Sequence, residues 1–289
     1  MKCRLSILGA LALCLSLTAN AQLNNPNNIA FDSSGNLWVA NFGANNVLEL
    51  NPATGAVLNT ITNGLNGPTR LQFVGASLYV LNTTGNTITI YSGLTNPGAK
   101  LIGTINIPNS VSRSLGAAVD AYGDVYVSGS TSDNVIALNI GRSLVETLTQ
   151  DKSGFSFAAP GTLVIHGQDI YVSFGSGDSE DAVISYNVGE FLTGDPQEMT
   201  VYNDNVNTGP TGVAFDSKGN VYISEYYSGT AVKYAPGKGT TPLLVINHGT
   251  SGCEGIALDK SGNIYVSNAL LNNITVYSPS GGAPIRTLN

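Results

Sequence analysis

Two glutamates, Glu225 and Glu254, lie beside strand-like segments and could do chemistry. Glu225 follows the strand-like run Val-Tyr-Ile-Ser, and Glu254 precedes the run Gly-Ile-Ala-Leu. Carboxylate and amide oxygens are the ligands that a hard divalent cation such as Ca²⁺ or Mg²⁺ prefers. With the amides of Asn41, Asn82 and Asn268, the two glutamates could form a metal site if the fold brings them together. The alternative is that they are solvated surface carboxylates.

A second candidate is the segment that contains His248 and Cys253. His248 could act as a general base, because imidazole changes its charge near neutral pH. A nucleophilic thiol at Cys253 would need a lowered pKa and a histidine partner, and His248 is five residues away. The alternatives are a surface histidine and a half-buried small residue. The other histidine, His166, occupies a turn position and is expected to be structural.

The most acidic segment of the chain runs from Gly175 to Asp181. Asp178, Glu180 and Asp181 could bind calcium through their carboxylates, although the ligand alternation of an EF-hand loop is absent. The alternative is a solvated acidic loop. We therefore expect no cofactor, with a divalent cation, Ca²⁺ or Mg²⁺, as the open alternative.

These residues must be positioned by an internal repeat. The clearest copies, 29–39, 213–223 and 256–266, share an apolar strand, an Asp-x-x-Gly turn and a second strand with an aromatic residue. Three degenerate copies are centred on 78–80, 125–127 and 170–172. The six copies recur every 41 to 51 residues, a spacing of about 45 residues that is typical of four-stranded propeller blades.

Each copy carries four strand signals, which in the first lie at 29–32, 37–41, 47–50 and 57–61. The sequence therefore predicts an all-β, six-bladed β-propeller with four antiparallel strands per blade. The expected blades are 22–65, 66–111, 112–158, 159–208, 209–251 and 252–289, forming a single domain. Both end copies look complete, so we expect the ring to close by packing of blade six against blade one. The aromatic residue of each copy is expected in the core between blades.

The run Gly209–Ser224 resembles the NHL repeat, and so do the first and last copies. This group is similar to gluconolactonase-like propellers, to strictosidine-synthase-like propellers and to streptogramin lyases. The resemblance implies that one mouth of the central channel carries the residues just before the first strand and just after the second strand of each blade. The ligand-binding residues it implies here, together with a tyrosine that breaks the repeat, are Asn41, Arg70, Asn82, Glu225, Tyr226, Glu254 and Asn268. A metal-binding Asp-Gly pair of the gluconolactonase-like group is replaced by Thr211-Gly212.

Residues 1–21 have the pattern of a cleaved signal peptide, with Lys2 and Arg4, an apolar stretch and Ala-Asn-Ala before Gln22. The sequence therefore predicts a secreted or periplasmic protein and favours a bacterial origin. Cleavage would leave Cys253 as the one cysteine, which excludes an intramolecular disulfide. A net charge of −7 argues against nucleic acid as a partner. We expect no membrane span after the signal peptide and a monomer.

The scarcity of histidine and the missing aspartate favour a non-catalytic binding or scaffold module. Its polar mouth would bind a protein, a glycan or a small ligand. The alternative is a metal-assisted hydrolase or lyase of the gluconolactonase or streptogramin-lyase kind, with Glu254, Glu225 and His248 as catalytic candidates.

Overall fold

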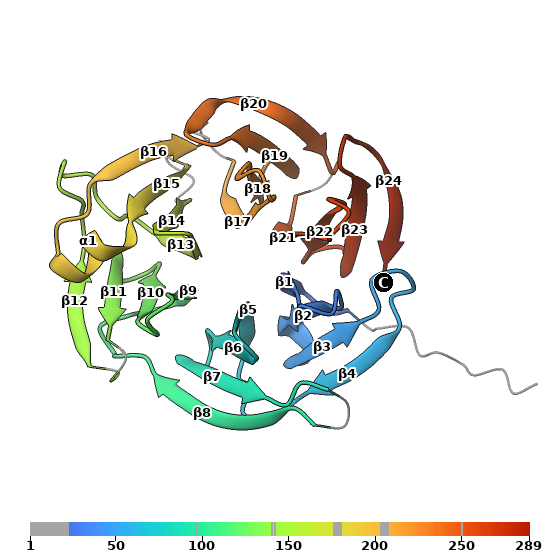
Figure 1. Ribbon diagram of the computed structural model, residues 1–289, viewed down its shortest axis with the longest axis horizontal. Coiled ribbons are helices and arrows are strands. Elements are labelled where there is room, and N and C mark those ends of the chain that lie inside the picture. Colours follow the sequence, from blue (N-terminus) through green and yellow to red (C-terminus); the bar gives the residue numbers. More distant parts are fainter. Residues whose placement is uncertain are drawn as a thin grey trace, which may run out of the picture.

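Six four-stranded antiparallel sheets surround a central axis in the computed structural model (Figure 1). The structure describes residues 23–95, 98–139, 141, 143–175, 181–202, 208–249 and 251–289. In every sheet four consecutive strands pair in chain order, from the innermost to the outermost. This arrangement confirms the predicted six-bladed β-propeller. The expected signal peptide lies outside the described residues.

Each blade is one contiguous stretch of chain. Blades one and two contain β1 (Pro26–Phe31), β2 (Leu37–Asn41), β3 (Asn46–Leu50), β4 (Val57–Ile61), β5 (Pro68–Val74), β6 (Ser77–Asn82), β7 (Thr87–Ser92) and β8 (Lys100–Asn106), with a 3-10 turn, η1 (Phe42–Ala44), after β2. Blades three and four contain β9 (Ser114–Val119), β10 (Val125–Gly129), β11 (Asn134–Leu138), β12 (Leu144–Leu148), β13 (Pro160–His166), β14 (Asp169–Phe174), β15 (Ala182–Asn187) and β16 (Glu198–Tyr202). Blades five and six contain β17 (Pro210–Phe215), β18 (Val221–Glu225), β19 (Thr230–Ala235), β20 (Lys238–Asn247), β21 (Cys253–Leu258), β22 (Ile264–Asn268), β23 (Asn273–Ser278) and β24 (Gly281–Leu288).

The Asp-x-x-Gly segments form the tight turns between the first two strands of a blade, as predicted. In blade five, Oδ1 of Asp216 accepts hydrogen bonds from the backbone N–H groups of Lys218 and Asn220, at 2.9 and 3.0 Å. Gly219 has φ +76°, a conformation in which a side chain would be strained. The aspartate thus fixes the turn, and the glycine permits it.

The hydrophobic core lies between neighbouring blades. The aromatic residue of the second strand joins the cluster at each of the six blade boundaries, and these residues are Trp38, Tyr79, Tyr126, Tyr171, Tyr222 and Tyr265. All but the half-buried Tyr79 are buried. This distribution confirms their predicted place in the inter-blade core.

One helix, α1 (Val188–Thr193), interrupts blade four between β15 and β16. The side chain of Asn187 accepts a hydrogen bond from the Gly189 N–H at the start of the helix, and Gly194 ends it in the left-handed conformation. Phe191 is fully buried beside Tyr126 and Phe157. This helical insertion therefore contributes to the core between blades three and four.

Blade six packs directly against blade one without exchanging a strand. Oγ of Ser267 on β22 donates a hydrogen bond to the carbonyl oxygen of Asn27 on β1, at 2.7 Å. Beside it, the rings of Phe31 and Tyr265 meet edge to face with centroids 5.0 Å apart. The expected closure by packing is confirmed.

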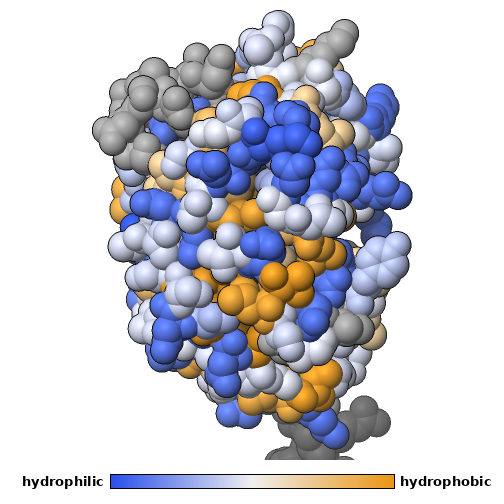
Figure 2. All heavy atoms as spheres, turned by 90° about the vertical axis from the view of Figure 1, so that its left-hand side faces the viewer, coloured by the Kyte–Doolittle hydropathy of each residue, from blue (hydrophilic) through white to orange (hydrophobic). Residues whose placement is uncertain are grey.

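The outermost strands leave apolar side chains in contact with solvent. Figure 2 shows hydrophobic atoms among polar ones on the side of the ring that carries β12 and β16. Leu144, Val145 and Met199 of these strands are exposed. Across the described ranges, no helix has the length and apolar character needed to cross a membrane.

Candidate active site

A cavity of about 600 Å³ opens where the innermost strands begin. Its walls combine the residues at the start of these strands with the turns between the second and third strands. The residues that line it are Asn25, Asn27, Phe42, Thr69, Arg70, Thr83, Arg113, Leu115, Ser130, Ala159, Gly161, Thr162, Gly175, Gly209, Pro210, Thr211, Tyr226, Tyr227, Glu254 and Ala269. The volume lies within the range of about 300–1,000 Å³ that is typical of small-molecule sites.

Glu254 enters this cavity from β21, and its backbone is held by blade five. Oγ of Ser224 donates a hydrogen bond to the Glu254 carbonyl oxygen at 3.1 Å. Oγ1 of Thr211 donates a hydrogen bond to the preceding carbonyl, that of Cys253, at 2.7 Å. A Cβ on Gly212 would lie 2.7 Å from the Glu254 carbonyl oxygen, so the glycine permits this close approach of β17 to β21. The backbone of Glu254 is therefore fixed.

The carboxylate of Glu254, by contrast, has no hydrogen bond or ion pair with any residue that the structure describes. Burial raises the pKa of Glu254, and the positive charges of Arg70 and Arg113 oppose that rise. A carboxylate with a raised pKa and free oxygens is a stronger base than an exposed glutamate. It is suited to accept a proton from a bound molecule.

Arg70 provides a positive charge in the same cavity. Its Nη1 and Nη2 donate hydrogen bonds to the carbonyl oxygens of Thr69 and Thr211, at 3.2 and 3.1 Å. Burial lowers the pKa of Arg70, and the charge of Glu254 partly restores it. Arg113, an exposed residue that precedes β9, contributes a second guanidinium to the lining.

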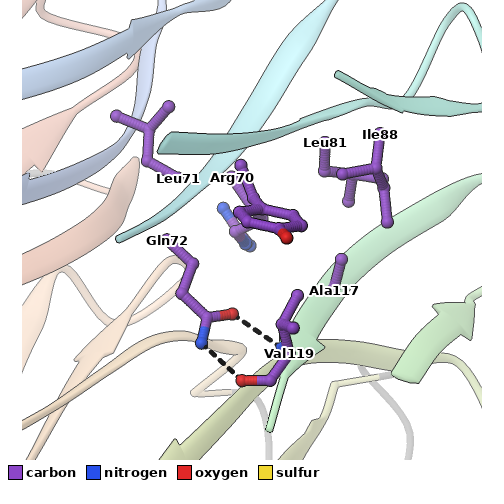
Figure 3. Close-up of a pocket in the computed structure, with 8 residues that line it drawn as sticks. Arg70, Leu71, Gln72, Leu81, Ile88, Ala117 and Val119 are labelled. Carbon is purple, nitrogen blue, oxygen red and sulfur yellow. Dashed lines mark hydrogen bonds between the residues drawn. The ribbon is translucent and has the colours of Figure 1, made fainter. Parts of the chain in front are cut away.

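Behind Arg70 lies a much smaller pocket, between blades two and three (Figure 3). The side-chain amide of Gln72 spans from β5 to β9 through two hydrogen bonds of 2.8 Å with the backbone of Val119. The remaining wall is mostly apolar, from residues such as Leu81 and Ile88. Its volume of about 10 Å³ is close to that of one water, so a substrate cannot enter.

Two tyrosines form one wall of the large cavity. The rings of Tyr226 and Tyr227 meet at 86° with centroids 5.3 Å apart. Burial raises the pKa of Tyr226, and the nearby Glu254 charge adds to the rise. Arg70, Tyr226 and Glu254 are thus three predicted ligand-binding residues that the structure brings together.

The other four predicted ligand-binding residues, Asn41, Asn82, Glu225 and Asn268, do not line the cavity. All four are buried at the ends of second strands, where they stabilise turns. Oδ1 of Asn82, for example, accepts a hydrogen bond from the Asn66 N–H at 3.0 Å. The carboxylate of Glu225 accepts hydrogen bonds from the hydroxyl groups of Ser228 and Thr230. The expectation of one shared surface is corrected: the polar atoms of these side chains bind the protein's own backbone, hydroxyl and side-chain amide groups.

The two histidines also lie outside the cavity lining. Nδ1 of His248 is 2.6 Å from the hydroxyl oxygen of Tyr277, and burial lowers the pKa of His248. His166 stacks on Phe215 with ring centroids 4.2 Å apart. Cys253 is fully buried, and burial together with the charges of Glu225 and Glu254 raises the pKa of its thiol to about 12. A thiol with that pKa is not an activated nucleophile.

The donor set of the cavity does not fit a divalent cation. Its one carboxylate, Glu254, faces two guanidinium groups, which would repel a metal ion. Within the described ranges, no three His, Cys, Asp or Glu side chains are grouped to hold a metal. Asp178 and Glu180 fall outside those ranges. Asp181 is buried and accepts a hydrogen bond from the Gly209 N–H at 2.9 Å, which makes it a structural carboxylate.

Sequence reasoning missed Arg113 and Ser130 of blade three. None of the predicted ligand-binding residues is in this blade, whereas the cavity is lined by the arginine that precedes β9 and by the serine that follows β10. Arg113 has φ +53°, unusual for a residue other than glycine. Asn25 in blade one also has a positive φ, +50°, and lines the cavity. Arg113 directly precedes the first strand of its blade, which is where the resemblance implies residues of the mouth.

No family model matches the chain, and none of the curated proteins matches it. Solved structures do match, among them three lyases. Virginiamycin B lyase from Staphylococcus aureus matches with a TM-score of 0.62 and 13% identity, over 88% of this chain and 80% of the lyase. A streptogramin B lyase matches with a TM-score of 0.63 and 14% identity, over 93% and 84%. A catalytically inactive histidine-to-alanine variant of the Staphylococcus aureus enzyme, with quinupristin, matches with a TM-score of 0.64 and 13% identity, over 93% and 86%.

At this identity the likeness shows the fold, a six-bladed propeller similar to that of virginiamycin B lyase. The neighbours nevertheless overturn the main functional expectation. A non-catalytic binding or scaffold module was favoured by the sequence, whereas the three solved propellers named above are lyases or a variant of one. The enzymatic alternative is the better supported of the two.

Proposed function

We propose that the protein is a lyase in which Glu254 acts as the general base. The observation that carries this proposal is the state of Glu254: a carboxylate in a cavity of substrate size, with a raised pKa and no hydrogen-bonding partner among the residues that the structure describes. The likeness to lyases supports the reaction class.

In the proposed reaction Glu254 removes a proton from a carbon next to a carbonyl or carboxyl group. Negative charge then develops on the oxygen of that group. Arg70 and Arg113 stabilise this charge, because fixed cations in a partly dehydrated site interact strongly with an oxyanion. The leaving group on the neighbouring carbon departs with its electron pair, and a double bond forms.

Hydrogen exchange in D₂O tests the first step without requiring knowledge of the leaving group. Carbonyl and carboxyl compounds would be incubated with the protein, and loss of the proton next to the carbonyl followed by NMR. Glu254→Gln should reduce the exchange rate by a factor of about 10²–10⁴, the usual contribution of a general base. His248→Ala and His166→Ala are the controls, since neither residue lines the cavity. Unchanged exchange in Glu254→Gln, or its loss in His248→Ala, would contradict the proposal.

We also infer that the blades are of the NHL type and that the chain is exported. Support for the first comes from the Asp-x-x-Gly turns and the second-strand aromatic residues of Gly209–Ser224 and its copies. A circular permutant opened between Thr208 and Gly209 should then fold cooperatively, whereas one opened within β18 should not.

The proposed export is tested separately. Mass spectrometry of the secreted protein should find Gln22 at its N-terminus, and a retained Met1 would refute cleavage.

A further inference from the structure

Arg70 places a positive charge in the cavity without a direct ion pair to any residue that the structure describes, although the charge of Glu254 is close enough to affect its pKa. Its side chain is 8% exposed, and its Nε is buried without a hydrogen-bonding partner. The two other nitrogens bind neutral backbone carbonyls, and no carboxylate oxygen of the described chain lies within 4.0 Å. A buried charge that lacks a partner is costly. A bound anion would offset that cost.

The surroundings of Arg70 add positive charge. The ionisable side chains that line the cavity are the two arginines, Glu254 and the two tyrosines, which together give a positive balance while the tyrosines are neutral. The whole chain, in contrast, has a net charge of −7. Ser130 also lines the cavity, and its hydroxyl has no hydrogen-bonding partner in the described part of the chain. The cavity lining therefore has a positive balance within an acidic protein, and such a balance attracts anions.

The rest of the lining is apolar and partly aromatic. Phe42 and Leu115 contribute hydrophobic surface, as do the rings of Tyr226 and Tyr227. Aromatic walls favour a ligand with a flat apolar body. The anion that fits is therefore an organic one with such a body, rather than a small inorganic ion.

We propose that the cavity binds an organic carboxylate, whose carboxylate group lies against Arg70 and Arg113 and whose apolar body packs against the tyrosine wall. This inference rests on the proposed function and names its substrate class: a carboxylate with a leaving group on the β-carbon.

In the reaction, Glu254 takes the proton of the α-carbon, and that C–H electron pair forms the carbon–carbon double bond. The bond to the leaving group breaks, and this group departs with its electron pair and takes up the proton from Glu254. The products are an α,β-unsaturated carboxylate and the protonated leaving group. Two cations are needed because removal of the α-proton places a second negative charge on the carboxylate.

Cinnamate tests the site as an aromatic, α,β-unsaturated carboxylate that resembles the proposed product. Calorimetry should show cinnamate binding at least about tenfold more tightly than cinnamamide, its neutral analogue, because a hydrogen bond to a charged group contributes more than one to a neutral group. Arg113→Gln should weaken cinnamate binding about tenfold and leave cinnamamide unchanged. Lys218→Gln, which removes the same charge from an exposed turn outside the cavity lining, is the matched control. Equal binding of acid and amide, or no effect of Arg113→Gln, would overturn the inference.

Arg70→Met gives a second measurement and should weaken cinnamate binding at least as much. If this variant does not fold, the exposed Arg113 still decides the question. Glu254→Gln separates the two proposals, since it should retain cinnamate binding while losing α-proton exchange. Binding that depends on Arg113, together with exchange that ignores Glu254, would refute the lyase and keep the carboxylate site. If neutral carbonyl compounds exchange their proton in a Glu254-dependent reaction and cinnamate does not bind, the carboxylate site is refuted and the lyase proposal is kept.

Discussion

The guanidinium of Arg70 donates a hydrogen bond across the ring to the carbonyl oxygen of Thr211, 3.1 Å away. Arg70 is on β5 of blade two and Thr211 is on β17 of blade five, which face each other across the centre (Figure 1). The same carbonyl accepts a hydrogen bond from the hydroxyl of Thr162 on β13. Three inner strands thus meet at one oxygen, and Arg70 is held in the cavity beside Glu254.

Replacing Arg70 by Met should raise the pKa of Glu254 further. The guanidinium favours the ionised carboxylate, and this attraction opposes the effect of burial. NMR titration of the Glu254 side-chain carboxyl carbon would measure the change. Lys218→Gln, a control of equal charge change, should leave the titration unaltered. A Glu254 pKa that falls or stays constant in Arg70→Met would show that the two charges do not interact.

Glu254→Gln should stabilise the protein at neutral pH, by about 1–3 kcal/mol in the free energy of unfolding. The folded-state pKa of Glu254 is raised by burial despite Arg70 and Arg113, so the ionised form is less favourable in the folded than in the unfolded chain. Stability of the wild type should therefore fall as the pH rises from the ordinary value of 4.5 through the raised pKa. The neutral amide lacks this loss, so the two proteins should converge below pH 4.5. Urea unfolding over a pH series would measure the difference, and a variant less stable at pH 7 would contradict the argument.

Asp216→Ala should destabilise blade five at pH 7 by about 1–2 kcal/mol. Burial alone would raise the pKa of Asp216, but hydrogen bonds from Asn220, Lys218 and Lys233 outweigh it and lower the pKa to about 2. The stabilisation is therefore complete above pH 3.8 and is lost as the pH falls through about 2. Urea unfolding of both proteins should show a gap that closes in acid.

Asp195→Ala is the control for this turn, because its ion pair with Lys152 is exposed and worth little. An equal loss of stability in Asp195→Ala would show that the turn hydrogen bonds of Asp216 are not the cause.

Ser267→Ala should weaken the closure between blades six and one. Oγ of Ser267 accepts a hydrogen bond from the Gly255 N–H at 2.8 Å and donates one to the Asn27 carbonyl at 2.7 Å. Loss of both bonds should lower the free energy of unfolding by about 1–3 kcal/mol. Ser261→Ala, in an exposed turn of the same blade, should be neutral in the same thermal unfolding measurement. Equal melting temperatures for the two variants would show that Ser267 does not stabilise the ring closure.

Local sequence signals predicted the fold because each blade depends on contacts among nearby residues. Asp216 and Gly219 are three residues apart, and their turn forms from local hydrogen bonds. Trp38 and its five counterparts recur at the same place in each repeat, which identified the core between blades. A serine of the second strand carried a similar signal: Ser128, Ser224 and Ser267 each donate a hydrogen bond to a carbonyl of the next blade. This part of the pattern was not recognised.

The amino-acid sequence by itself determined the number of blades, their strands and turns, and the place of Glu254 at the start of an inner strand. Only the tertiary structure decided which polar residues face the cavity. Asn82 and Glu225 have sequence positions as suggestive as that of Glu254, yet side chains of their own blades bind them. Arg70 and Thr211 are 141 residues apart and meet because the ring closes. Such contacts depend on the orientation of side chains from different blades, and a repeat of about 45 residues specifies each blade without specifying what it meets across the channel.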